Sequence, residues 1–303
     1  MTRLPSVGPG APALVADVGG TTIKVARIDE TGALSEPVRV PTPRDGARTP
    51  ERILERIAAE GDGSERILGI GVPGIVDDAR GVGVFSENLG WRDADFRALG
   101  REVAGLDTAV LHDVRAAGLA EQRLGAAAGL DDVVVITLGT GISAAVVIGG
   151  SLHVAGGYAG EIGHAVVVDG GEPCVCGNTG CLEAVASAAA IARRYETRTG
   201  REVAGAHEVL ALADAGDAAA QRVWSTAVDA LAVGISHVAA LIAPQAVVLG
   251  GGLSEAGDAL FSPLERRLEE RYRLRRTPVV RARLGENAGV IGVALHTRET
   301  ERA

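Results

Sequence analysis

The stretch from Gly160 to Glu183 constrains this chain most strongly, because all three cysteines of the protein lie there, close to a histidine. Thiolate and imidazole are the ligands that Zn²⁺ prefers, and four of them complete a tetrahedral site. The glycines between these residues allow sharp turns around an ion. The pattern therefore predicts a loop held by structural zinc, with the ligands His164, Cys174, Cys176 and Cys181. The alternative is three buried cysteines beside an unrelated histidine, and clustered cysteines with none elsewhere are hard to obtain by chance.

Two carboxylates, Glu161 and Glu183, bracket the predicted zinc loop. We expect the loop to hold these acids and His164 toward one pocket. Glu183 also begins an expected helix, Glu183–Tyr195, where the helix dipole favours a carboxylate even without a ligand. Both interpretations of Glu183 stay open from the sequence.

Composition limits the class of protein. A chain of 303 residues can form one large or two ordinary domains. Hydrophobic residues make up 47% and aromatic residues 3%, so aliphatic side chains must build a globular core. The net charge of −9 argues against a nucleic-acid partner. We also expect no membrane partner and a cytoplasmic location, because no long apolar run or signal core is present and the cysteines suit a reducing compartment.

Near the N-terminus, a loose arm at residues 1–12 is expected to lead into a hairpin. Two apolar strands, Leu14–Val18 and Ile23–Ile28, flank the turn Gly19–Thr22. Backbone N–H groups of such a turn can converge on phosphate oxygens, and Asp17 at the end of the first strand can hold Mg²⁺ through water. The alternative is a plain hairpin without a ligand.

A second hairpin repeats this pattern. The strands Val133–Leu138 and Ile142–Ile148 flank the turn Gly139-Thr140-Gly141. An internal repeat of a phosphate-type hairpin implies two related halves that face one cleft.

Between the hairpins, the strand Ala109–Leu111 delivers His112 and Asp113 just before an expected helix, Arg115–Leu124. An acid at the carboxyl end of a strand lies where open α/β sheets bind ligands. The equally plain alternative is that Asp113 caps the helix.

The remaining expected elements complete an α/β pattern. The strands are Leu34–Val40, Ile67–Val72, Val82–Phe85, Ser151–Val154, Ala246–Leu249 and Val279–Ala282. The helices are Pro50–Glu60, Asp93–Val103, Glu208–Ala215, Ala218–Ile242, Phe261–Tyr272 and a terminal helix that begins in Gly285–Thr297. Gly250–Gly252, between a strand and a helix, allows either a phosphate or flat ligand to approach the backbone or close helix–sheet packing.

These motifs together resemble the ROK family of sugar kinases and sugar-responsive repressors over roughly residues 14–299. The resemblance rests on DVGGTT, VPGIVD, TLGTGIS, GEIGH and CVCGNTGCLE. It implies an α/β, two-domain actin-like ATPase (ribonuclease H-like) fold of the sugar kinase type, with sugar and ATP in the interdomain cleft. We expect a small N-terminal domain at 1–113, onto which a terminal helix at about 287–303 packs back. A larger domain at 114–286 would carry the zinc loop.

The resemblance also implies roles for residues, with Asp113 as the general base. The implied sugar-binding residues are Gly74, Asn88, His112, Asp113, Glu161, His164 and Glu183. The implied ATP- and phosphate-binding residues are Asp17, Gly19, Gly20, Thr21, Thr22, Lys24, Gly139, Thr140, Gly141, Gly251 and Gly252. Zn²⁺ as a structural ion and Mg²⁺ with ATP are the implied cofactors, and a homodimer or homotetramer is expected.

The expected activity is therefore an ATP-dependent hexose kinase that phosphorylates the 6-hydroxyl of glucose or a related hexose. One alternative is an N-acetylmannosamine or N-acetylglucosamine kinase, and another is a sugar-sensing regulator that does not bind DNA. A DNA-binding repressor is disfavoured because only 13 residues precede the first expected strand. A zinc-ribbon nucleic-acid module is disfavoured by the acidic charge and the few aromatic residues.

His112 departs from the family resemblance, because glucokinases of the family usually carry Asn-Asp where this chain has His112-Asp113. If the imidazole contacts the sugar, its protonation would place a positive charge beside Asp113 and lower the basicity of that carboxylate. We then expect kcat/KM to fall on the acid side, near or below the ordinary histidine pKa of ~6.5. His112→Asn would weaken that fall and shift the preference toward glucose. The alternative is that the imidazole simply substitutes for the amide. Glu87, where proline is common, is a second departure.

Overall fold

The computed structural model describes residues 4–302, which form two compact units. The first unit contains the chain up to Ala128, the segment Leu152–Ala159 and the stretch after Gly285. The second unit contains Gly129–Ser151 and Gly160–Gly285.

The border between the units differs from the border expected between residues 113 and 114. Helix α3 (Asp113–Leu124) stays in the first unit, because it packs along the terminal helix α9 (Ala288–Arg302) of that unit. The segment Leu152–Ala159 also returns to the first unit, which a division at a single point of the chain cannot describe.

The first unit is built on a five-stranded sheet in the order β3-β2-β1-β4-β8. Strands β1, β4 and β8 are parallel, and β2 and β3 extend the sheet antiparallel beside β1. The bounds are Ala13–Val18 for β1, Thr22–Ile28 for β2, Val38–Pro41 for β3, Ile67–Val72 for β4 and Asp107–His112 for β8. The parallel strands run as near-continuous apolar segments, as expected when helices cover both faces.

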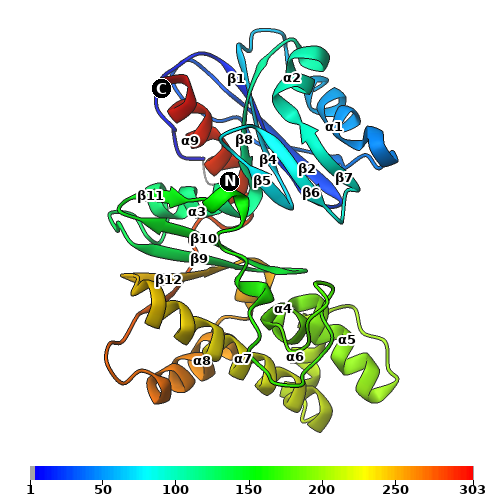
Figure 1. Ribbon diagram of the computed structural model, residues 1–303, viewed down its shortest axis with the longest axis vertical. Helices are drawn as coiled ribbons and strands as arrows, with labels where there is room; N and C mark the ends of the chain where they lie inside the picture. The colour runs from blue at the N-terminus through cyan, green and yellow to red at the C-terminus, as the bar shows by residue number, and fades with distance from the viewer. Residues whose placement is uncertain (1–3, 303) are drawn as a thin grey trace. The chain divides into compact units, whose positions relative to one another are not determined.

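Helices α1 (Thr49–Ala58) and α2 (Phe96–Ala104) cover one face of this sheet, and α9 packs on the other (Figure 1). Side chains alternate between the two faces of a strand. Leu68 and Ile70 of β4 therefore enter the core with α1 and α2, whereas the intervening glycines of β4 face α9.

A small three-stranded sheet also belongs to the first unit, in the order β5 (Ile75–Asp77), β6 (Val82–Ser86) and β7 (Trp91–Asp95). The sequence did not predict β5 or β7, and the helix expected from Asp93 begins only at Phe96. Asp95 caps it, since its carboxylate accepts a hydrogen bond of 2.9 Å from the N–H of Ala98.

The first residues are not the loose arm that the sequence suggested. The N–H of Val7 donates to the carbonyl of Gly32 at 3.0 Å. Arg298 of α9, only 1% exposed, donates to the carbonyls of Gly8 and Asp29 at 3.2 and 2.9 Å. This segment is thus pinned between the first hairpin and the terminal helix. Residues 1–3, the start of the expected arm, lie outside the described residues.

The second sheet repeats the plan of the first, in the order β11-β10-β9-β12-β13, and all of it except most of the edge strand β11 belongs to the second unit. Strands β9 and β10 form an antiparallel hairpin, and β12 and β13 continue parallel to β9. This confirms the internal repeat inferred from the two hairpins. The bounds are Val133–Leu138 for β9, Ile142–Ile148 for β10, Ser151–His153 for β11, Ala246–Gly250 for β12 and Val279–Arg281 for β13.

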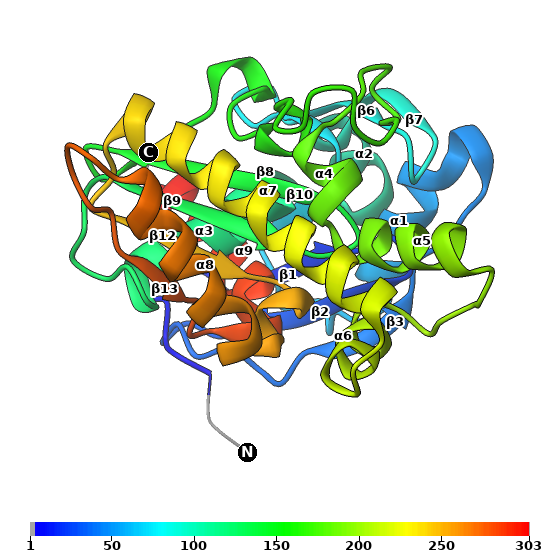
Figure 2. The ribbon, with the colours of Figure 1, turned by 90° about the horizontal axis from the view of Figure 1, so that it is seen from below.

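Helices pack on one face of the second sheet, with α7 lying across it and α8 beside it (Figure 2). They are α4 (Leu182–Ala186), α5 (Ala188–Thr199), α6 (Ala206–Asp214), α7 (Ala218–Ile242) and α8 (Asp258–Arg271). The single helix expected over Glu183–Tyr195 is wrong. Ser187 is extended and breaks it, because its hydroxyl accepts a hydrogen bond from the N–H of Ala190 at 3.1 Å and caps α5.

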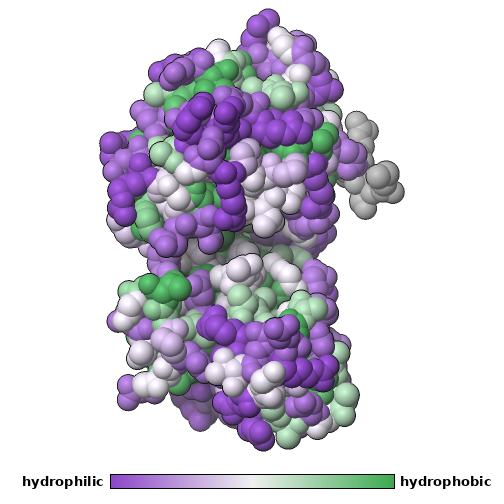
Figure 3. Space-filling view, turned by 90° about the vertical axis from the view of Figure 1, so that its right-hand side faces the viewer, coloured by the Kyte–Doolittle hydropathy of each residue, from purple (hydrophilic) through white to green (hydrophobic). Residues whose placement is uncertain are grey.

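Helix α7 is, within the part of the chain that the structure describes, the one helix long and apolar enough to cross a membrane by length and composition alone. Its buried residues, including Val223, Leu231 and Ile235, belong to the core cluster of the second unit. We therefore interpret α7 as the central core helix of that unit. The face drawn in Figure 3 is mostly hydrophilic, with only scattered apolar groups.

Close packing of α9 depends on glycines. A Cβ at Gly292 would overlap the carbonyl oxygen of Ala116 in α3, and one at Gly69 of β4 would overlap the hydroxyl of Thr297. Both positions therefore exclude a side chain. The two glycines thus let the Thr297 side chain of α9 lie directly on β4 and the backbone of α9 lie against the start of α3.

We predict that Gly292→Ala destabilises the protein by about 1–3 kcal/mol, because the new methyl group forces α9 away from α3. Helix propensity alone predicts the opposite sign, a gain of about 1 kcal/mol. Urea unfolding measures the change. Thr300→Ala, at an exposed position of the same helix, is the matched control and should stay within about 0.5 kcal/mol of wild type. A stabilised Gly292→Ala protein would contradict the packing described here.

Candidate active site and metal centre

Two acids of the first unit stand at the same edge of its sheet. Asp17 lies at the end of β1, and Asp113 directly follows β8. Because β1, β4 and β8 are parallel, their carboxyl ends share this edge, where α/β sheets bind ligands. Gly71 of β4 lies between them, and a Cβ there would be 3.8 Å from the Cα of Asp113.

Both acids have unusual protonation chemistry. Burial and the negative charge of Asp113 raise the pKa of Asp17 to about 7, while Lys24 opposes that shift. Burial also raises the pKa of Asp113 to about 6. Carboxyl groups that titrate near neutrality are enriched at functional sites, where one of them can accept a proton during a reaction.

Lys24 and Gly289 hold the surroundings of Asp17. Lys24 is the cross-strand partner of Asp17 in the β1–β2 hairpin, and its ammonium donates to the carbonyl of Glu286. A Cβ at Gly289, in the first turn of α9, would collide with the Asp17 carboxylate. The N-terminus of α9 therefore lies directly beside this carboxylate, where a helix dipole favours negative charge.

Asp113 is not the cap of α3. His112 occupies the N-cap position and makes no capping bond through its side chain, and Asp113 is the first helical residue. The Asp113 carboxylate accepts a hydrogen bond of 2.7 Å from the N–H of Val114, and 28% of its side chain remains exposed. The capping alternative is thus wrong, and part of the carboxylate remains accessible from solvent.

His112 faces the predicted base. Its Nε2 lies 3.2 Å from Oδ1 of Asp113, and its side chain is only 7% exposed. Its Nδ1 is buried and has no hydrogen-bond partner within residues 4–302. Burial and the positive charge of Arg115 lower the pKa of His112 to about 3. Of the expected range, near or below 6.5, only protonation well below 6.5 agrees with this lowered pKa.

The first glycine turn is closed by a hydrogen bond of 3.0 Å from the N–H of Gly19 to the carbonyl of Thr22. Arg44, which the sequence analysis missed, donates to the carbonyls of Gly20 and Asn88 at 2.9 and 3.1 Å. It ties the turn to the predicted sugar-binding position Asn88, whose side chain is exposed. No motif surrounds Arg44, so sequence patterns offered no signal for it.

The second glycine turn closes in the same way, with the N–H of Gly139 donating to the carbonyl of Gly141 at 2.9 Å. Oε2 of Glu183 accepts a hydrogen bond of 2.8 Å from the N–H of Ile142, just after the turn. Glu183 therefore braces this hairpin, beyond any interaction with the dipole of α4. Gly251, with φ of +81°, packs against the backbone of Leu138 immediately before the turn.

The remaining predicted residues occupy turns. Gly74 has φ of +102°, and a side chain there would collide with the carbonyl of Phe85. Thr21 and Thr140 are exposed at the tips of their hairpins, and no heavy atom lies within 4 Å of a Cβ built on Gly252. These positions leave backbone groups accessible to a ligand.

The four predicted metal ligands meet in the second unit. The ligand atoms of His164, Cys174, Cys176 and Cys181 all lie within 4.8 Å of one another. Nδ1 of His164 is 3.6 Å from Sγ of Cys174, and Sγ of Cys176 is 3.6 Å from Sγ of Cys181. A zinc tetrahedron with ordinary bond lengths has edges of about 3.5–3.8 Å, so this donor set fits Zn²⁺.

Burial and the two neighbouring thiols raise the pKa of Cys181 to about 12, so this thiol is neutral near pH 7 unless a cation lowers its pKa. Nε2 of His164 is directed toward Glu161, with 3.8 Å between Nε2 and Oε2. An outer carboxylate of this kind commonly orients a histidine ligand.

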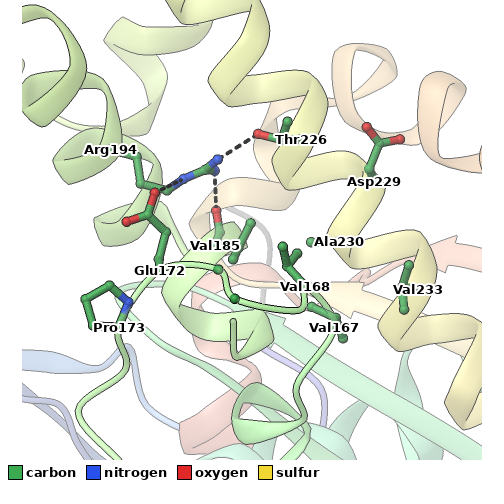
Figure 4. Close-up of a pocket in the computed structure, with 12 residues that line it drawn as sticks. Val167, Val168, Glu172, Pro173, Val185, Arg194, Thr226, Asp229, Ala230 and Val233 are labelled. Atoms are coloured by element: carbon green, nitrogen blue, oxygen red, sulfur yellow. Dashed lines mark hydrogen bonds and ion pairs between the residues drawn. The ribbon is translucent and has the colours of Figure 1, made fainter. Parts of the chain in front are cut away.

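Arg194 of α5 anchors the zinc loop to the helices (Figure 4). Its guanidinium donates to Glu172 of the loop at 3.4 Å, to the carbonyl of Val185 at 2.8 Å and to the hydroxyl of Thr226 in α7 at 2.7 Å. These residues line a cavity of about 460 Å³ that is otherwise largely apolar. The cavity contains none of the predicted ligand residues, so we assign it a structural place beside the loop.

Comparison with known proteins identifies the family. A glucokinase of Halalkalibacterium halodurans is 35% identical over 314 residues, which cover 95% of each chain. An N-acetylmannosamine kinase of Yersinia pestis is 32% identical over 291 residues, covering 94% of this chain and 98% of that protein. The crystal structure of a Streptomyces griseus ROK glucokinase in complex with glucose and AMPPNP matches with a TM-score of 0.79 and 30% identity, covering 95% and 99% of the two chains.

These similarities cover 94–95% of the chain and therefore run through both units. The expected α/β, two-domain actin-like fold of the sugar kinase type is confirmed by the similarity to solved ROK kinases. The ROK family model matches residues 14–299, and the chain therefore belongs to the ROK family.

Proposed function

We propose that the protein is an ATP-dependent kinase that phosphorylates the 6-hydroxyl of glucose. The observation that carries this proposal is Asp113, a partly exposed carboxyl group with a pKa of about 6, at the sheet edge it shares with Asp17. Such a group is ionised at neutral pH and basic enough to accept a proton from an attacking alcohol. The glucokinase relatives support glucose as the sugar.

In the proposed reaction, O6 of glucose attacks the γ-phosphorus of ATP. A new P–O bond forms while the bond from the γ-phosphorus to the bridging oxygen breaks, and ADP leaves with that electron pair. The proton of the 6-hydroxyl passes to the Asp113 carboxylate. Phosphoryl transfer has a loose transition state, so positioning and charge neutralisation supply most of the acceleration.

The glycine turns and Lys24 would hold the nucleotide. Backbone N–H groups of Gly19–Thr22 and Gly139–Gly141 suit phosphate oxygens, and Gly251 and Gly252 suit close approach of the adenosine. Mg²⁺ that arrives with ATP neutralises phosphate charge when bound, and Asp17 would hold it through water.

Zinc would act as a structural ion, held by the four ligands of the loop. Its chemistry is to fix the loop, so that Glu161 and His164 keep one orientation toward sugar hydroxyls. The partners we propose are hexose and ATP, without nucleic acid or membrane. The family resemblance supports a homodimer or homotetramer and a cytoplasmic location.

The second candidate is an N-acetylmannosamine kinase, which the Yersinia pestis relative supports. We expect glucose 6-phosphate as the main product when the purified protein receives Mg²⁺, ATP and each sugar of a panel. The panel contains glucose, mannose, N-acetylglucosamine and N-acetylmannosamine, and product is identified by mass and NMR. A higher kcat/KM for an N-acetylhexosamine would replace glucose in the proposal, and no transfer to any sugar would contradict a kinase.

Asp113→Asn is the matched control for that assay, because it keeps the shape of the side chain and removes its basicity. We expect kcat to fall by about 10²–10⁴-fold while glucose still binds. In the wild type, Asp113 must be ionised to act, so kcat/KM should fall as pH drops through about 6. His112→Asn should keep an acid limb, since His112 is already neutral in this range. Wild-type turnover by Asp113→Asn would remove the residue from its role.

For zinc, we predict about one equivalent per chain by metal analysis, with Zn–S distances of ~2.3 Å by X-ray absorption. Cys181→Ser should lose the metal and weaken glucose binding, because the loop then no longer fixes His164. Thr179→Ser, in the same loop, is the control and should retain the metal. A metal-free wild type that binds glucose with full affinity would overturn the assignment.

A further inference from the structure

Arg115 and Asp78 form a buried ion pair behind the predicted base. Arg115 is 1% exposed and Asp78 is 9% exposed. The guanidinium grips the carboxylate with two hydrogen bonds, from Nε to Oδ2 and from Nη2 to Oδ1, each 2.8 Å long. Bidentate pairs of this kind are strong and directional. A charge so deeply buried is tolerated only when it is paired in this way.

The same arginine joins three segments of the first unit. Its Nη2 donates to the carbonyl of Val76 in β5 at 2.7 Å, and its Nη1 to the carbonyl of Gly157 at 3.4 Å. Gly157 has φ of +98°, and a Cβ there would collide with the carbonyl of Val76. Arg115 therefore fixes β5 and the segment Leu152–Ala159 relative to the first turn of α3.

Asp78 connects Arg115 to His112, the residue that precedes the proposed base Asp113. Its Oδ1 also accepts a hydrogen bond of 3.3 Å from the backbone N–H of His112. The imidazole of His112 then turns its Nε2 toward Asp113, while Nδ1 stays buried without a partner in residues 4–302. A neutral ring carries one hydrogen, and only Nε2 has an acceptor within reach, so that nitrogen should carry it.

We propose that Arg115 is a positioning residue for the general base, acting through Asp78 and His112 to fix the carboxylate of Asp113. The proposal rests on the kinase function proposed above and adds a residue to it. Arg115 does not touch substrate in this account. Its effect is geometric, and a misplacement of about 1 Å in a reacting group can lower a rate by about 10²-fold.

Charged groups face His112 and Asp113 from several elements, and each of them can affect the pH profile of kcat/KM. Asp17 of β1 lies near Asp113, and Arg115 lies on α3 itself. Arg97 of α2 donates to the carbonyl of Asp78 at 3.4 Å, and His296 of α9 interacts with the Asp78 charge. Among them, Arg115 is the cation that lowers the pKa of Asp113 against the effect of burial.

The competing explanation is that the pair only stabilises the fold. Arg298 offers a matched control, because it is equally buried in the same unit and also donates to several backbone carbonyls. It holds the N-terminal segment and makes no hydrogen bond to His112 or Asp113 among those the structure describes. Loss of either arginine should lower Tm, whereas only the loss of Arg115 should lower kcat.

The test compares Arg115→Met, Arg298→Met and the double variant Arg115→Met/Asp78→Leu. Each is measured for Tm and for kcat, KM and the pH profile with glucose and ATP. Arg115→Met should lower Tm and lower kcat by about 10²-fold, with a smaller change in KM. Its acid limb should move to higher pH, because the cation that lowers the pKa of Asp113 is gone. Arg298→Met should lower Tm and keep kcat within about twofold.

The double variant separates the effect of Arg115 on the position of Asp113 from its effect on the stability of the fold. It leaves no unpaired buried charge, so it should regain much of the lost Tm and remains measurable even if Arg115→Met fails to fold. We expect its kcat to stay low. Arg115→Lys, which keeps the charge and loses the two-pronged grip, should restore the acid limb and only part of kcat.

If the wild type is an active kinase, either of two results overturns the positioning role of Arg115 and leaves the proposed function intact. One is a kcat that recovers together with Tm in the double variant, and the other is an equal loss of kcat in Arg298→Met. An inactive wild type contradicts the proposed function, and the inference falls with it.

Discussion

The close approach of α9 to β4 and α3 is the constraint on which the first unit depends. Glycines at 69, 71, 289 and 292 leave no room for side chains, so side chains of α9 lie directly on the backbone of β4, and the backbone of α9 meets that of α3. As a result the first turn of α9 lies beside the Asp17 carboxylate, and the start of α3 carries Asp113 to the same sheet edge. Two acids separated by almost 100 positions in the sequence are thereby brought near each other in a partly buried place, and burial raises the pKa of each.

Burial also explains the pairing of the charged side chains behind Asp113, because a buried charge is tolerated only when it is paired. Arg115 and Asp78 are buried and hydrogen-bonded to each other and to neighbouring backbone groups. Asp113, by contrast, keeps part of its side chain exposed, where a ligand can reach it. The Arg115–Asp78 pair can therefore hold its shape while the carboxylate in front of it changes protonation. In the second unit the zinc loop is also held from outside. Arg194 donates to Glu172 in the middle of the loop, and Glu183 at its end accepts from the N–H of Ile142, while the cysteines and His164 face one another.

The sequence predicted the features that lie within one short segment and missed those that depend on contacts between distant residues. The hairpins and the metal-ligand cluster were predictable, since each lies within a short segment with a recognisable pattern. The pinning of residues 4–12 by Arg298 was not, because it joins the two ends of the chain. The break at Ser187 needed knowledge that one hydroxyl caps a new helix. The backbone N–H of His112 donates to Asp78, 34 positions away, and the neighbours of His112 in the sequence gave no sign of this contact.

The protonation of His112 tests the account most directly, because a neutral ring turned toward Asp113 is what the buried pair is inferred to maintain. The chain has six histidines, and comparison with His112→Asn assigns the signals of this one in ¹⁵N NMR spectra of the ring nitrogens. We predict a neutral ring with its hydrogen on Nε2 throughout pH 5–8, as its pKa of about 3 requires. A titration of His112 with a midpoint near pH 6.5, or a hydrogen on Nδ1, would contradict the account.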